Sequence, residues 1–280
     1  MIDSTKPSRW GATPDDWFYF NTILGLTSDL LPVVSNLEAT ISPDSGMKKI
    51  GKTPSRYNRE REVVGIANWT SKQSTLLEVA RWSDNPDYGI SVVARILKAL
   101  DNDITDTELA DSIRAHIVSW FYRADLPLPP ERSRANSSKF LLAFFLHEET
   151  TKRVIKTRAG IIEFLGDRQQ FIAAGTHDSG ARYEWSKQDG DVPELTLAQF
   201  DDLWNSLAAA FGIEPPITER KTQQVEADIN EPMFKALEEK GMVLSKGRNG
   251  AYNIVCPFEH EHTTESAESA TVYYPAHTGG

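Results

Sequence analysis

The stretch ISVVARILKALDND, residues 90–103, joins a long apolar run to two closely spaced carboxylates. The run is rich in β-branched and aliphatic side chains, which is typical of a buried segment. Successive side chains of an extended chain point to opposite faces, so Asp101 and Asp103 would share one face. A second pair with the same spacing, Asp189 and Asp191, flanks a glycine in a polar stretch and is interpreted as a solvated turn.

Patterns on either side of this stretch alternate between helical and extended, which predicts a mixed α/β (α+β) fold. Helices are expected at 15–27, 72–82, 106–122 and 196–211, and in PMFKALEEKG after Glu231. Strands are expected at 30–34, 140–146, 161–165 and 170–174. A polar stretch that follows two prolines predicts a first domain at 1–212, a linker at 213–230 and a second unit at 231–280.

The composition is that of an ordinary globular protein. Its 280 residues are 40% hydrophobic and 25% charged, and a chain of this length can bury a sizeable core. No run approaches the roughly 18 apolar residues of a membrane span, and the N-terminus lacks a signal-peptide pattern. Cys256 is the only cysteine in the sequence, which excludes an intrachain disulfide framework. We therefore expect a cytoplasmic protein with no membrane partner.

The net charge of −10 argues against binding of nucleic acid, because such binding depends on neutralising phosphates. Positive charge is nevertheless concentrated in two stretches of the sequence. Two solvated faces would produce the same pattern, so the charge does not decide the function by itself. The first stretch holds Lys48, Lys49, Lys52, Arg56, Arg59 and Arg61, and the second holds Arg132, Arg134, Lys139, Lys152, Arg153, Lys156 and Arg158.

A third acidic residue, Glu163, lies within the apolar segment GIIEFLG. A lone carboxylate on such a face is unfavourable unless a cation accompanies it. One explanation is a divalent ion shared with Asp101 and Asp103, and the other is a salt bridge, for example to Arg158 or Lys156. The two aspartates alone are also compatible with a strand end capped by acids. An all-oxygen site suits Mg²⁺ or Mn²⁺, and a pair of such ions is what nucleotidyl transfer needs.

A group of potential phosphate donors precedes the strand expected at 140–146. In an extended segment RSRANSSKF, Ser137 and Lys139 share a face and can address one phosphate cluster. The pattern GxxxxGK[ST] is absent, which excludes an ATPase-type phosphate loop. His177 stands between two glycines in AAGTHDSG, where backbone can approach a ligand closely; a surface histidine is the alternative. The candidate nucleotide-binding residues are Arg132, Arg134, Ser137, Lys139 and His177.

Five segments spread over roughly residues 28–190 resemble one known family. In chain order they are LLPVVSN, GKTPSRYN with NWT, NPDYGI with ALDND, RSRANSSKFLL, and IIEFLGDRQQFIAAGTHDSGARYEW. Together they are similar to the archaeo-eukaryotic primase superfamily, specifically the bifunctional primase-polymerases of phage and plasmid type. The last segment is the most specific match, with an acidic strand, a glutamine-aromatic strand, a Gly-x-His turn and a Tyr-x-Trp ending.

The resemblance implies the primase-polymerase fold, in which an N-terminal mixed α/β unit packs on an antiparallel sheet like that of RNA-recognition motifs. It implies a DNA primase or DNA polymerase of phage or plasmid replication, in the cytoplasm of a bacterium or a phage-infected cell. The reaction would be template-directed nucleotidyl transfer with two Mg²⁺ or Mn²⁺ ions. The partners would be a DNA template or primer and dNTPs or NTPs, and a helicase region would follow in a longer chain.

Residue roles are implied by the motif positions. Asp101 and Asp103 match the family's first acidic motif, which holds the metals, and Glu163 falls where the third metal acid is placed. Ser137 and Lys139 match the triphosphate motif, in which many relatives have Ser-x-His; we expect the lysine to keep phosphate binding. Arg132 or Arg134, together with His177, would assist in binding the nucleotide. The expected DNA contacts are Lys48, Lys49, Lys52 and Arg56. Of these, Lys52 would contact either the nucleotide or the template.

After the linker, NIVCPFEHEHT resembles the start of a zinc-binding module found downstream of such domains. Cys256 and His262 match its first ligand pair, and the closing pair would lie beyond Gly280. His260 and His277 could replace the missing closing pair of zinc ligands. One cysteine with three histidines at this spacing would, however, be an unusual zinc site. We expect this segment to be a truncated module with an incomplete site and no ordered Zn²⁺. The alternative is that it is an acidic tail without a metal-binding role.

Two other functions fit parts of the pattern. A two-metal nuclease also needs clustered carboxylates, but it does not need the phosphate donors at 132–139. A replication-initiator module would bind DNA without synthesis, and it would keep that binding when Asp101 is replaced.

Overall fold

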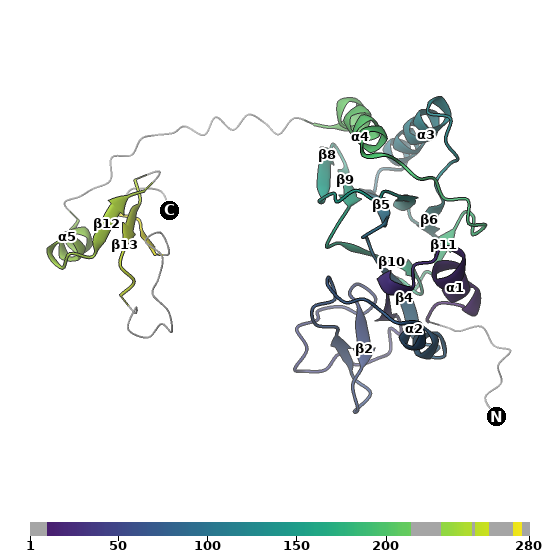
Figure 1. Ribbon diagram of the computed structural model, residues 1–280, viewed down its shortest axis with the longest axis horizontal. Coiled ribbons are helices and arrows are strands. Elements are labelled where there is room, and N and C mark those ends of the chain that lie inside the picture. Colours follow the sequence, from purple (N-terminus) through teal and green to yellow (C-terminus); the bar gives the residue numbers. More distant parts are fainter. Residues whose placement is uncertain (1–9, 214–230, 248–249, 258–270, 276–280) are drawn as a thin grey trace. The chain divides into compact units, whose positions relative to one another are not determined.

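Two compact units make up the chain. The computed structural model describes residues 10–213, 231–247, 250–257 and 271–275, and the units divide between residues 214 and 215. This division falls close to the expected end of the first domain at residue 212. Apart from residue 213, the expected linker lies outside the described residues. The larger unit is drawn from purple to green in Figure 1.

The apolar run at 90–100 is divided between two sheets, so its prediction as one segment is wrong. Its halves belong to β4 (Tyr88–Val93) and β5 (Leu97–Ile104). Between them Arg95 leaves the apolar interior, and its guanidinium pairs with the buried carboxylate of Asp29. The two aspartates at the end of the run consequently lie within β5 rather than after it.

Strand β5 lies in the middle of a six-stranded antiparallel sheet. In sheet order the strands are β11 (Tyr183–Trp185), β6 (Glu131–Arg134), β7 (Phe140–Phe145), β5, β9 (Gly160–Leu165) and β8 (Arg153–Thr157). Helices α3 (Thr107–Arg123) and α4 (Leu197–Phe211) cover one face of this sheet (Figure 1). Leu100 of β5 and Phe164 of β9 are buried there against Phe200 of α4.

The opposite face of this sheet packs against a smaller antiparallel sheet with the order β1 (Leu30–Val34), β4, β10 (Gln170–Ala174). Leu97 and Ala99 of β5 join Ile90 of β4 in one buried cluster. Figure 1 shows β4 and β10 below β5, with α1 (Pro14–Phe18) and α2 (Leu76–Ser83) on the same side. The first half of β5 is therefore buried on both faces.

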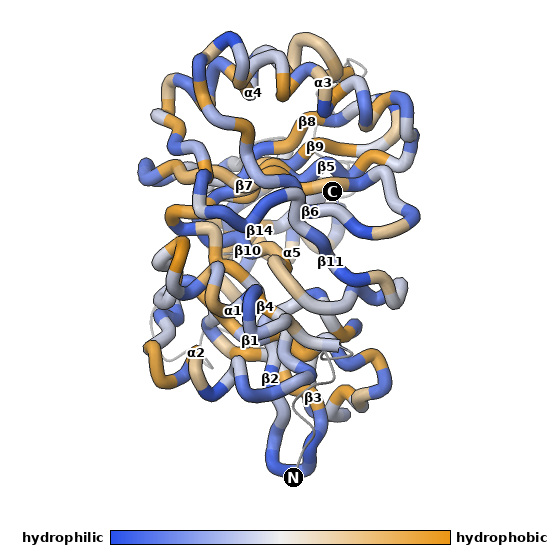
Figure 2. The backbone as a smooth tube through the Cα atoms, turned by 90° about the vertical axis from the view of Figure 1, so that its right-hand side faces the viewer, coloured by the Kyte–Doolittle hydropathy of each residue, from blue (hydrophilic) through white to orange (hydrophobic). Residues whose placement is uncertain are grey.

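A polar hairpin adjoins the smaller sheet and carries part of the basic segment at 48–61. It consists of β2 (Ser55–Tyr57) and β3 (Val63–Gly65), and its turn is drawn blue at the lower end of Figure 2. Ser55 Oγ accepts a hydrogen bond from Val34 N–H at 3.0 Å, which ties the hairpin to β1.

The helices begin where the sequence supplies a cap. Asp106 caps α3 as expected, since its carboxylate accepts a backbone N–H at 2.8 Å. Thr196 and Thr75 form capping boxes at α4 and α2. Because Thr75 fixes the start of α2, the helix expected at 72–82 begins only at Leu76.

Other elements agree with the sequence only in part. The helix expected at 15–27 is confirmed only in part, because α1 continues as a π-helical turn, η1 (Tyr19–Ile23), and the chain then leaves the helix at Gly25, which has a φ of 65°. Strands β2, β3, β6, β8 and β11 are not among those expected; all five are short, and β2, β6 and β11 are largely polar. The strands expected at 30–34, 140–146, 161–165 and 170–174 are confirmed within a residue.

The smaller unit has helix α5 (Pro232–Glu239), as expected, and three short strands among its described residues. The strands β12 (Val243–Lys246), β13 (Tyr252–Ile254) and β14 (Val272–Tyr273) form one antiparallel sheet. The rings of Phe234 and Tyr252 pack with their centroids 4.5 Å apart. Cys256 follows β13, whereas His262, His260 and His277 lie outside the described residues.

The mixed α/β class predicted from the sequence is confirmed, and all paired strands named above run antiparallel. No helix in the described part of the chain combines the length and the apolar character needed to cross a membrane.

Gly89 lies in β4 where the chain has no room for a side chain. A Cβ at this position would be 2.4 Å from Ala174 O and 2.5 Å from Ser35 Oγ. We therefore expect Gly89→Ala to lower the free energy of unfolding by about 1–3 kcal/mol, measured by urea denaturation. Gly46→Ala is the control, because nothing lies within 4 Å of its Cβ position. An unchanged unfolding midpoint for Gly89→Ala would contradict the described packing.

Candidate active site

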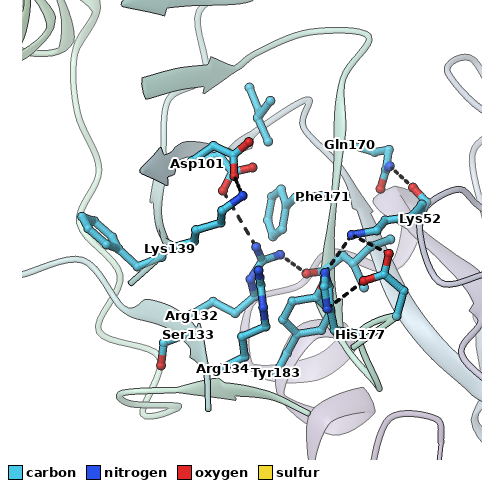
Figure 3. Close-up of a pocket in the computed structure, with 15 residues that line it drawn as sticks. Lys52, Asp101, Arg132, Ser133, Arg134, Lys139, Gln170, Phe171, His177 and Tyr183 are labelled. Atoms are coloured by element: carbon cyan, nitrogen blue, oxygen red, sulfur yellow. Dashed lines mark hydrogen bonds and ion pairs between the residues drawn. The ribbon is translucent and has the colours of Figure 1, made fainter. Parts of the chain in front are cut away.

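One face of β5 changes from apolar to acidic along its length. Leu97 and Ala99 on this face are buried against the smaller sheet. The next two side chains on the same face, Asp101 and Asp103, extend past that contact and line a cavity of about 400 Å³ (Figure 3). Their side chains are 34% and 49% exposed, so both carboxylates are accessible from the cavity.

Glu163 lies directly beside Asp101. The register pairs these two residues across β5 and β9, and directly opposed residues of antiparallel strands point to the same face. The Glu163 carboxylate forms an ion pair with Lys152 at 2.7 Å, rather than with Arg158 or Lys156, which were suggested by the sequence. Glu163 is not among the residues that line the cavity. The structure thus brings the third acid next to the first, but does not direct it into the cavity.

The three carboxylates act on one another electrostatically. Burial raises the pKa of Asp101, the charges of Asp103 and Glu163 raise it further, and the charge of Arg132 opposes them. Lys139 forms an ion pair with Asp103. As the side chains stand, no three acidic, histidine or cysteine residues within the described ranges converge on a metal position. Carboxylate oxygens are ligands that Mg²⁺ and Mn²⁺ prefer, so the type of donor suits these ions, but Asp103 and Glu163 are each paired with a lysine here.

Arg132 points toward the acids from β6. Its Nη2 lies 4.0 Å from Asp101 Oδ1, its Nη1 donates to Ile172 O, and its guanidinium lies 4.4 Å from the centroid of the Tyr183 ring. Figure 3 shows it between Asp101 and the residues on the opposite side of the cavity. The side chain is only 9% exposed, and its buried Nε has no hydrogen-bond partner. Burial lowers the pKa of Arg132, but an arginine stays charged.

Lys52 and His177 face each other on the opposite side of the cavity. Lys52 Nζ lies 2.8 Å from His177 Nε2, and 3.6 Å from Asp178 Oδ2. In the tautomer that carries its proton on Nδ1, His177 accepts from the Lys52 ammonium at Nε2 and donates from Nδ1 to Asp178 Oδ1 or Ser179 Oγ. Burial lowers the pKa of His177 to about 4, and the charges of Lys52 and Arg134 contribute. His177 is therefore neutral at pH 7.

Arg134 lines the same cavity, but Ser137 does not. The chain leaves β6 at Arg134, turns at Asn136 with a φ of 59°, and enters β7 only at Phe140. The alternation assumed for Ser137 and Lys139 therefore does not apply. Ser137 Oγ accepts the backbone N–H of Lys139 at 3.2 Å and lines a neighbouring hollow instead.

The remaining predicted residues lie outside the cavity. Lys48 and Lys49 line a separate hollow, and Arg56 is exposed on β2. The second aspartate pair behaves as the solvated turn predicted, since Asp191 is 63% exposed and pairs with Lys187 at 3.2 Å.

Three residues of the site were not singled out from the sequence. Tyr183 supports Arg132 from β11, and Asp178 pairs with Lys52. Gln170 donates to Lys52 O at 3.0 Å and so fixes the loop that carries this lysine. All three residues occur in the run matched to the primase-polymerases, and this match is the one signal in the sequence that could have indicated them.

Neither a protein-family model nor a curated protein matches this chain. The resemblance to primase-polymerases therefore remains a prediction from motifs, and the geometry of the cavity is what bears on function.

The protonation of His177 tests the described electrostatics. Its pKa of about 4 lies below the ordinary 6.5, so the unfolded chain binds a proton between these values that the folded chain does not. Stability should therefore fall as the pH is lowered from about 6.5 to about 4, and less so in His177→Gln. NMR titration of the ring should show a pKa near 4 that rises in Lys52→Met and is unchanged in Lys156→Met. An ordinary pKa near 6.5 in the wild type would contradict the burial and the contact with Lys52.

Proposed function

We propose that this chain is a template-directed nucleotidyl transferase of the primase-polymerase type, with residues 1–212 as its catalytic domain. The observation that carries the proposal is the arrangement of one cavity, which has two carboxylates on β5 and four cationic side chains around them. The carboxylates can bind divalent ions, and fixed cationic side chains can bind the outer phosphates of a nucleoside triphosphate. The cationic residues are Lys52, Arg132, Arg134 and Lys139.

Asp101 and Asp103 would hold the divalent ions, with Glu163 as the adjacent third acid. Bound Mg²⁺ or Mn²⁺ lowers the pKa of an attacking hydroxyl and stabilises charge on phosphoryl oxygens. Lys139 neutralises Asp103 in this structure and lines the same cavity. It is placed to bind a phosphate oxygen once another cation compensates Asp103. Lys152 neutralises Glu163 in the same way.

The opposite side of the cavity suits the triphosphate. Arg134 and Lys52 supply two positive charges, and neutral His177 holds the Lys52 ammonium at 2.8 Å. Arg132 is more deeply buried and lies between the acids and these cations, so it keeps the two sides at a fixed separation. A primer 3′-hydroxyl, or that of an initiating nucleotide, would attack the α-phosphate and release pyrophosphate. Such a reaction serves the replication of phage or plasmid DNA.

The two alternative functions use only part of this cavity. A two-metal nuclease accounts for the carboxylates, but not for the group of Lys52, Arg134 and His177 across from them. A DNA-binding initiator module accounts for basic residues on the surface, but not for adjacent acids in a cavity, where burial and then their mutual repulsion raise the pKa of Asp101.

Replacement of both cavity aspartates tests the proposal. The wild type should extend a primed template with dNTPs in the presence of Mg²⁺ or Mn²⁺. In Asp101→Asn/Asp103→Asn the rate should fall by about 100-fold or more, because several kcal/mol of charge stabilisation are lost. Primer extension on a gel, with unfolding curves for each variant, gives the measurement.

The chain contains its own matched control. Asp189→Asn/Asp191→Asn makes the same chemical change in a solvated turn and should keep the wild-type rate. Equal extension by the cavity variant and the wild type would contradict the proposal. Strand cleavage that is lost in the cavity variant and unaffected by dNTPs would favour the nuclease.

A further inference from the structure

A second hollow, larger than the cavity, lies against the loop before β2. Its volume is about 820 Å³, within the range of ligand-binding sites. The loop contributes one wall and the chain that leaves β3 contributes the other. We call it the lysine groove; it is lined by residues 44–49, 52, 53, 64–67 and 69.

The charge of the groove is predominantly positive. Lys48, Lys49 and Lys52 line it with one acid, Asp44. Asp178 lies outside the groove, 3.8 Å from Lys49 Nζ and 3.6 Å from Lys52 Nζ, and compensates these charges in part. Lys49 keeps 69% of its side chain exposed, so its ammonium is available to an anion in the groove.

The wall that faces these lysines is apolar and carries an aromatic ring. Ile66 and Trp69 line the groove from this wall and are only partly buried, and Met47 adds an apolar side chain from the loop of the lysines. The backbone turns at Asn68, which has a φ of 51°. The carbonyl of Asn68 accepts a hydrogen bond from Ser71 N–H at 3.1 Å, and this bond fixes the backbone beside Trp69. A groove with cations on one side and a partly exposed indole on the other offers contacts for both a phosphate chain and a flat base.

Lys52 belongs to both hollows. It lines the groove with Lys48 and Lys49, and it lines the cavity with Asp101 and Arg134. A strand lying in the groove would therefore pass from the lysines directly to the cation side of the cavity.

We propose that the lysine groove binds single-stranded nucleic acid as the template, with a base against Trp69 and phosphates on Lys48 and Lys49. The role as template rests on the proposed function, whereas the binding itself does not. Single strands are held by this combination of a cationic track and an aromatic platform. In a duplex the bases are stacked on one another and are not available to the indole. An acidic peptide would satisfy the lysines but gains no stacking on Trp69.

Binding of a fluorescein-labelled oligo-dT is measured by anisotropy in EDTA without nucleotides, so that no synthesis takes place. Trp69→Leu should weaken binding by about 5- to 100-fold, whereas Trp69→Phe, which keeps an aromatic ring, should restore most of it. Lys48→Ser/Lys49→Ser should weaken binding and reduce the slope of log affinity against log salt by about 1.4. The matched control is Lys156→Ser/Arg158→Ser, which removes the same charge from the end of β8 and the turn after it and should have little effect.

Several outcomes would overturn the inference. One is an unchanged affinity for oligo-dT in Trp69→Leu, and another is an equal loss of affinity in the groove double variant and its control. The others are tighter binding of duplex than of single-stranded DNA, and competition by polyglutamate that is as strong as competition by unlabelled oligo-dT. Failure of the proposed function is a different result: primer extension would be absent while oligo-dT binding still depended on Trp69. Extension that is normal in both groove variants would leave the proposed function intact and contradict the template role.

Discussion

The strict alternation of side chains along β5 is the constraint on which the rest of the site depends. One face of this strand passes from Leu97 and Ala99, buried between the two sheets, to Asp101 and Asp103 at the cavity. A shift of one residue in its register would bury both carboxylates under the helices and expose Leu100. The packing that fixes β5 in the sheet therefore also fixes the position of the acids.

The charges in the cavity are held without full compensation. Arg132 approaches Asp101 only to 4.0 Å, and its buried Nε has no partner. Lys52 is held close to a neutral imidazole, and burial lowers its pKa. A buried charge without a close partner, such as that of Arg132, reduces stability, so its position is explained more readily by a ligand with both negative charge and attached cations than by a structural role. A nucleoside triphosphate with divalent ions has this composition.

Much of this could be predicted from the sequence where local rules decide. The alternation around Asp101, the cap at Asp106 and the apolar strands follow from periodicity and side-chain chemistry. The break at Arg95 could not be predicted, because the pairing of its guanidinium with Asp29 depends on a contact 66 residues away in the sequence. Ser137 was misplaced for a similar reason: a turn at Asn136 interrupts the extended segment that the argument assumed. Tyr183 and Gln170 act through tertiary contacts that periodicity does not predict, and only the matched run in which they occur points to them.

The most direct test of the central claim is a crystal structure of the chain with Mn²⁺ and a non-hydrolysable dNTP analogue, in which anomalous scattering locates the ions. We expect Mn²⁺ on the Asp101 and Asp103 carboxylates, Lys139 displaced from Asp103, and the triphosphate extending toward Lys52 and Arg134. Manganese or nucleotide bound elsewhere, with the Lys139–Asp103 ion pair intact, would contradict it.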